Sequence, residues 1–179
     1  MSRFSLNPVF SKFLYASILL TAAWVAFVKY QTHPFTSEEI VRFEFAGTPE
    51  RVTAILNEWE EKGWTTLAKN SIYLDFIFIF LYTASLALGC LTFPSLTGKI
   101  NLMNWGMRLY RFSLYAGLSD FLENLCLLEI IYGEERTFFP AAAWGLALIK
   151  FVIIGIVLLF LFRCLIHWAV SRISERFTR

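Results

Sequence analysis

Long runs of apolar residues, separated by shorter polar segments, dominate the hydrophobic pattern of this chain. A helix needs about 20 apolar residues to cross a hydrocarbon core about 30 Å thick. Four segments meet this length, at about 10–28, 71–93, 107–132 and 141–169. The connections after the second and third segments are short, which favours antiparallel neighbours. The pattern therefore predicts an all-α membrane protein, an antiparallel four-transmembrane-helix bundle that forms one domain over 1–179.

The polar segment 30–70 is the longest connection, and it predicts an amphipathic helix over 49–62. Thr48 suits the N-cap and Pro49 the first helical position. An apolar stripe at helical spacing follows, made of Val52, Ile55, Leu56 and Trp59. This stripe can close the mouth of the bundle as a lid or lie in the outer lipid interface, where tryptophan is common.

The residues just before this helix are ambiguous. Segment 41–45 alternates apolar and charged residues, as a strand does. The triplet 37–39, Ser-Glu-Glu, equally suits the start of a short helix. Both alternatives stay open.

Basic residues are distributed unevenly around the predicted spans. The chain is 57% hydrophobic with a formal net charge of +2. If both termini are cytoplasmic, that side has one acid, Glu175, and these basic residues: Arg3, Lys12, Lys99, Arg108, Arg111, Arg163, Arg172, Arg176 and Arg179. Lysine and arginine are enriched in cytoplasmic loops, so the pattern predicts an N-in/C-in topology. The basic residues flank spans and form no separate patch, so no nucleic-acid partner is expected.

Polar side chains inside the apolar segments are the candidate functional residues. An ionisable group within a bilayer costs about 2.5–3.5 kcal/mol on insertion scales, so it faces a bundle interior, a partner or a cavity. Asp120, Glu123 and Asn124 share one helix face, and the other groups lie at depths that allow contact with them. The predicted polar network, which is also the candidate ligand site, comprises Asp75, Tyr82, Asp120, Glu123, Asn124 and Lys150.

The network does not match a familiar catalytic or metal site. The two histidines, His33 and His167, lie outside the polar cluster in the sequence, which argues against a zinc site. Ser119 neighbours Asp120 in sequence but points to a different helix face, so no nucleophile–base pair is evident. A Gly-rich phosphate loop is missing from the sequence. No catalytic residue, metal or cofactor is therefore assigned.

Four motifs together resemble an uncharacterised family of bacterial four-helix integral membrane proteins. They are Thr48-Pro49-Glu50-Arg51, Leu74-Asp75-Phe76-Ile77-Phe78 with Tyr82, Asp120-x-x-Glu123-Asn124, and Lys150. The resemblance covers about 40–160. It implies a multi-pass protein of the bacterial inner (plasma) membrane whose polar residues recur as a unit, and it implies no activity.

These observations favour a non-catalytic module that binds a lipid or a small polar ligand, or that serves as a subunit with a partner membrane protein. The alternatives are a small proton- or ion-coupled transporter and an intramembrane enzyme acting on lipid, with Asp120 or Glu123 as general base. A binding module predicts a cavity at the network that opens to the exterior loop or sideways to lipid. A transporter predicts that polar residues also reach the cytoplasmic end.

Overall fold

The computed structural model describes residues 8–133 and 137–177, and within these residues helices are the only regular secondary structure. The described helices are α1 (Pro8–Thr32), α2 (Ser37–Glu44), α3 (Pro49–Glu61), α4 (Thr65–Leu96), α5 (Ile100–Tyr132) and α6 (Phe139–Phe177). The predicted all-α class is therefore confirmed for this part of the chain.

Three of the helices are long and apolar enough to cross a membrane. These candidate spans are Phe10–Thr32, Thr65–Leu96 and Phe139–Ser174. They contain the predicted segments 10–28, 71–93 and 141–169 and extend them, since the helices continue into polar flanking residues. Helix α5 has 33 residues, close to the 32 of α4. It is less apolar because it carries charged groups such as Arg108, Arg111 and Asp120.

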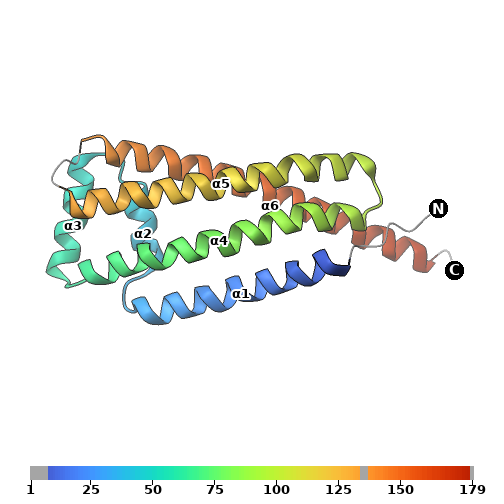
Figure 1. Cartoon of the computed structure of the whole chain (residues 1–179), viewed down its shortest axis with the longest axis horizontal. Coiled ribbons are helices and arrows are strands. Elements are labelled where there is room, and N and C mark those ends of the chain that lie inside the picture. The colour runs from blue at the N-terminus through green and yellow to red at the C-terminus, as the bar shows by residue number, and fades with distance from the viewer. Residues whose placement is uncertain (1–7, 134–136, 178–179) are drawn as a thin grey trace.

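The four long helices lie roughly parallel to one axis, as Figure 1 shows. Helix α5 packs against both α4 and α6, whereas α1 packs against α4 at the edge of the bundle. The start of α1 and the end of α6 lie at the same end of the molecule, and α6 extends beyond the other helices there (Figure 1). Helices α2 and α3 lie at the opposite end.

Segment 37–44 is helical, which decides the question that the sequence left open. Glu38 and Glu39 lie in the first turn of α2, where acidic groups favour the positive end of the helix dipole. Phe43 is buried in the apolar cluster beneath the helix. This burial favours a helix over a single unpaired strand, since a lone strand leaves its backbone hydrogen bonds unsatisfied.

Helix α3 begins and ends within one residue of the predicted range, and its apolar stripe faces the bundle. Thr48 accepts a hydrogen bond from the Arg51 backbone nitrogen at 3.4 Å, as an N-cap does. Trp59 is fully buried and its indole nitrogen donates to Glu39 at 3.2 Å. Of the two alternatives for the stripe, the burial of Trp59 therefore favours packing over the end of the bundle. The stripe packs in a cluster with residues of α4, α5 and α6, namely Ala68, Ile72, Leu127, Ile130 and Ala143.

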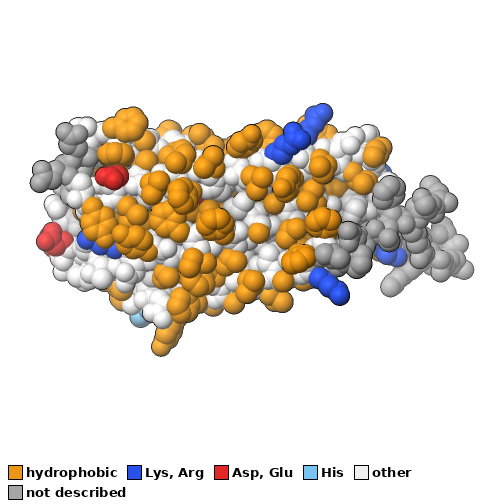
Figure 2. Space-filling view, in the orientation of Figure 1, with side chains coloured by type: hydrophobic (Ala, Val, Ile, Leu, Met, Phe, Trp, Pro, Cys, Tyr) orange, Lys and Arg blue, Asp and Glu red, His pale blue; other side chains and the backbone are white. Residues whose placement is uncertain are grey.

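The outer surface of the bundle is apolar along most of its length. In Figure 2 the middle of the visible face is covered by hydrophobic side chains, and charged side chains gather toward the two ends. Exposed apolar residues include Leu19, Phe80, Leu159 and Phe162. A continuous apolar belt of this size needs a nonaqueous surrounding, which for a set of long helices is a lipid bilayer.

Candidate functional site: a buried lysine–carboxylate network beside a groove

Lys150 on α6 lies among three carboxylates from two other helices. Its Nζ is 2.8 Å from Oδ1 of Asp120 and 2.9 Å from Oε2 of Glu123. A longer contact of 3.4 Å reaches Oε1 of Glu44. No side chain in this group is more than 7% exposed. Burial at this level removes most of the hydration of the charges, so the ion pairs replace water as the stabilising partner.

The remaining predicted residues join α4 to α5 beside this lysine. The Tyr82 hydroxyl donates a hydrogen bond to Oδ2 of Asp120 at 2.8 Å. The Asn124 amide donates to Oδ2 of Asp75, also at 2.8 Å. Both oxygens of Asp120 are therefore occupied, one by Tyr82 and one by Lys150.

The helical periodicity of α5 explains why its polar residues converge. The inward face of α5 consists of residues at steps of three and four, all of them buried: Ser113, Ala116, Gly117, Asp120, Glu123 and Asn124. Ser119 lies off this face, and its hydroxyl donates to the Leu146 carbonyl of α6 at 2.9 Å. The spacing in the sequence was thus sufficient to place the α5 residues of the network.

Glu44 at the end of α2 is a member of the network that the sequence analysis missed. A signal was present, because α2 taken as a helix places Glu44 one turn after Ile40 and beside Phe43 on the buried face. Burial raises the pKa of Glu44 above its ordinary value even though the Lys150 charge acts in the opposite direction. Oε2 of Glu44 is buried and has no hydrogen-bond partner among the described residues.

A groove of about 990 Å³ lies against the network. Its polar lining includes Glu44, Asp75, Tyr82, Asp120, Asn124 and Lys150. Its apolar walls come from α1 on one side and α6 on the other, with residues Ile18, Ala22, Val25, Phe151, Ile154 and Leu158. Since α1 packs against α4, the groove runs over α4 between α1 and α6 (Figure 1).

Polar contacts join α1 to α4 along the groove. The Trp24 indole nitrogen donates to the Leu74 carbonyl of α4 at 3.1 Å. Deeper in the bundle the hydroxyls of Thr21 and Ser85 lie 3.2 Å apart. Beyond this pair the lining of the groove is apolar, and its last residues there include Ile18. The polar lining therefore ends part of the way along the bundle.

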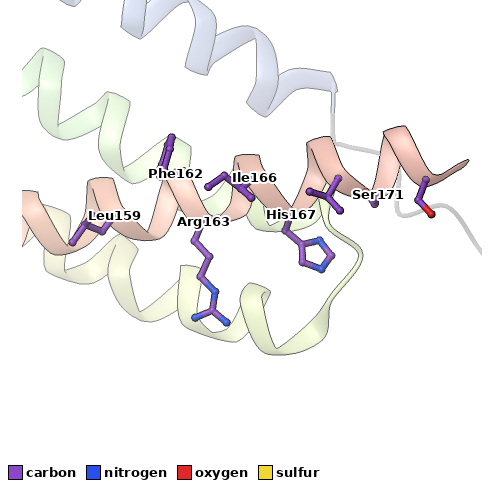
Figure 3. Close-up of a pocket in the computed structure, with 8 residues that line it drawn as sticks. Leu159, Phe162, Arg163, Ile166, His167 and Ser171 are labelled. Atoms are coloured by element: carbon purple, nitrogen blue, oxygen red, sulfur yellow. The ribbon is translucent and has the colours of Figure 1, made fainter. Parts of the chain in front are cut away.

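The two histidines lie in different places relative to the network. His33 lines the same groove as the carboxylates, near α2. The prediction that this histidine lies outside the polar cluster is therefore only partly right. His167 lies on the last part of α6, in a separate hollow of about 500 Å³. Figure 3 shows that hollow: Arg163 and His167 project from α6 to the same side. All the residues that line this hollow belong to α6, so it does not bring side chains of different helices together.

Metal chemistry has no support within the described residues. They contain no group of three or more His, Cys, Asp and Glu side chains arranged to hold a metal ion.

Comparison with protein-family models, with curated proteins and with solved structures finds no match to the chain. Fold and site together define a helical protein with three apolar candidate spans and a buried lysine–carboxylate network that faces a groove.

Proposed function

We propose that α5 is a fourth span and that the protein is a multi-pass protein of the bacterial inner membrane with both termini in the cytoplasm. Helix α5 supports this because it is about 50 Å long and lies between α4 and α6. Its charged residues Asp120 and Glu123 are buried inside the bundle, so they do not face lipid. The excess of basic residues near the two termini and in the connection 97–99 supports the orientation.

We infer that the protein is a non-catalytic membrane module that binds a lipid or another small amphiphile. The groove carries this inference. It has apolar walls for a hydrocarbon tail and a polar floor for a headgroup, the combination found in small-ligand sites. Because both walls are membrane-depth helices, the open side of the groove faces lipid, and a ligand can enter laterally from the bilayer.

Two features favour binding over transport or catalysis. The polar lining ends at Thr21 and Ser85, whereas a transport path needs polar groups along the whole bundle. A general base needs a free oxygen, but both oxygens of Asp120 accept hydrogen bonds from other side chains. Glu123 is fully buried and does not line the groove, so it cannot reach a ligand there.

The test compares a substitution that fills the groove with one that does not. Ala22 lines the groove on α1, whereas the exposed Ala26, one turn further along, does not. We expect native mass spectrometry from nanodiscs to show a retained lipid or small molecule on the wild type and on Ala26→Trp, and to show its loss on Ala22→Trp. A wild type that carries nothing, or an Ala22→Trp variant that retains the same ligand, contradicts binding in the groove.

A further inference from the structure

We propose that the ligand's polar end is cationic, and that the groove takes an amphiphile with a protonated amine headgroup. Its ammonium group binds the carboxylates of Asp75 and Glu44, and its hydrocarbon tail lies between α1 and α6. This inference rests on the proposed binding function and assigns the chemical class of the ligand.

The charge balance of the site is the first support. Four carboxylates gather here, those of Glu44, Asp75, Asp120 and Glu123. Among the described residues one cation, Lys150, forms ion pairs with them. Protons, whose binding the raised pKa of Glu44 favours, or a bound cation can balance the carboxylates that Lys150 does not. A headgroup whose only charge is negative would be repelled by the acids that are ionised.

Acceptor atoms beside the groove that lack a donor are the second support, independent of the charge count. Oε2 of Glu44 is buried and receives no hydrogen bond from a donor among the described residues, and its carboxyl lies against that of Glu123. Asp75 accepts one hydrogen bond, from Asn124 to Oδ2, and within the described residues none reaches Oδ1. Both residues line the groove. An unpaired buried acceptor destabilises the site, so a ligand with donors gains affinity by pairing with it.

An ammonium group fits these acceptors better than the alternatives. It supplies three donors and one positive charge, so one headgroup can satisfy more than one carboxylate oxygen. A hydroxyl headgroup supplies one donor and no charge. A divalent metal ion needs about six or more oxygen ligands, and the described residues contain no group of three or more His, Cys, Asp and Glu side chains arranged to hold one. The remaining wall of the groove is apolar and suits an alkyl chain.

The experiment uses two photo-crosslinking probes with the same dodecyl tail, one ending in a primary amine and the other in a hydroxyl. Full-length protein is studied in phosphatidylcholine nanodiscs, and crosslinked peptides are identified by mass spectrometry. We expect the amine to label α1 and α6 at groove residues, and to do so with about tenfold higher apparent affinity than the alcohol, the effect of one charge-assisted hydrogen bond.

Charge-removing variants locate the headgroup. Asp75→Asn keeps the shape of the side chain, and Glu44→Gln makes the same change outside the candidate spans. Each is expected to reduce amine labelling about tenfold and to leave alcohol labelling unchanged. Glu129→Gln is the matched control, because Glu129 is an exposed acid of α5 that does not line the groove. If Asp75→Asn fails to fold, Glu44→Gln and the comparison of the two probes on wild type still decide the result.

The outcomes separate this inference from the proposed function. Equal labelling by amine and alcohol, or amine labelling unaffected by both variants, overturns the cationic headgroup and leaves groove binding intact. Labelling of the groove by neither probe contradicts both. Nanodiscs that also contain phosphatidylethanolamine identify the source of the amine. Competition by that lipid assigns a phospholipid headgroup, and amine labelling without competition assigns a free lipophilic amine.

Discussion

Lys150 supplies the positive charge for three buried carboxylates, so its removal tests how strongly the network supports the fold. Lys150→Met keeps most of the side-chain volume but leaves Asp120 and Glu123 without their ion-pair partner. Breaking one side of a buried ion pair costs about 3–5 kcal/mol. We expect a correspondingly lower free energy of unfolding, measured by denaturant titration in detergent micelles.

The matched control for Lys150→Met is Lys62→Met, which makes the same change in an exposed ion pair. Lys62 forms an ion pair with Glu58 on the exposed surface of α3, where solvent screens the interaction. Its removal should leave the unfolding midpoint almost unchanged. A Lys150→Met variant as stable as Lys62→Met would mean that the buried carboxylates are already neutralised by protons and do not depend on the lysine.

Individual residues also show what the sequence could and could not predict about the site. The α5 residues were predictable because steps of three and four place them on one face, and Lys150 was conspicuous as a charge within an apolar segment. Glu44 was less conspicuous, because its position on the buried face follows only if 37–44 is taken as a helix, and a charge in a polar connection needs no explanation. Its role depends on where α2 packs against α6, a tertiary contact that local periodicity does not contain.

Glu44 makes α2 an element whose contribution to the stability of the protein depends on pH. Burial raises the pKa of Glu44 from its ordinary value of 4.5 while Lys150, Asp120 and Glu123 surround it. Between the ordinary and the raised pKa the folded protein holds a proton that the unfolded chain releases, so the stability contributed by Glu44 falls as pH rises. Glu44→Gln removes this pH-dependent contribution to stability. We expect the thermal midpoint of Glu44→Gln to rise relative to that of the wild type as pH increases above 4.5.

Glu50 on α3 provides a comparison of opposite sign. Hydrogen bonds to its own backbone nitrogen and to Thr48 lower the pKa of this exposed carboxyl. The stability that Glu50 contributes is present at neutral pH and is lost as pH falls, so the thermal midpoint of Glu50→Gln should fall relative to that of the wild type as pH rises.

The contrary outcome for Glu44 is also defined. If the thermal midpoints of wild type and Glu44→Gln change with pH in parallel, Glu44 has the same pKa in the folded and unfolded protein.

Helices α4 and α5 approach closely at Gly106, a contact that hydropathy does not reveal. A Cβ at Gly106 would lie 2.3 Å from the Cys90 carbonyl oxygen, a backbone atom that cannot rotate away. Gly106→Ala should therefore push the helices apart and cost about 1–3 kcal/mol, as overpacking does. Gly155→Ala is the control, because a Cβ there meets nothing within 4 Å. Equal unfolding midpoints for the two variants would contradict the close contact.

At the scale of the whole molecule, hydropathy predicted the long helices but not the space between them. The apolar runs are sufficient to specify α1, α4 and α6, since their length alone matches a bilayer. The groove requires that α1 pack against α4 and stand away from α6, held by Trp24 and Thr21. Those contacts join residues 50 and 64 positions apart, and no local pattern encodes them.

Membrane topology is the whole-molecule property that α5 decides. If the N-terminus is cytoplasmic, as proposed, four spans return the chain to the cytoplasm and place Arg172, near the end of α6, inside. With three spans the same residue lies outside. Arg172→Cys and Phe138→Cys place single exposed thiols on either side of α6. We expect a membrane-impermeant maleimide to label Phe138→Cys in intact cells, and to label Arg172→Cys only after lysis. Cys90 and Cys164 are buried, whereas Cys126 is partly exposed, so both variants are made in a Cys126→Ala background. The reverse labelling pattern would contradict the four-span topology with cytoplasmic termini. It would fit either three spans with a cytoplasmic N-terminus or four spans in the opposite orientation.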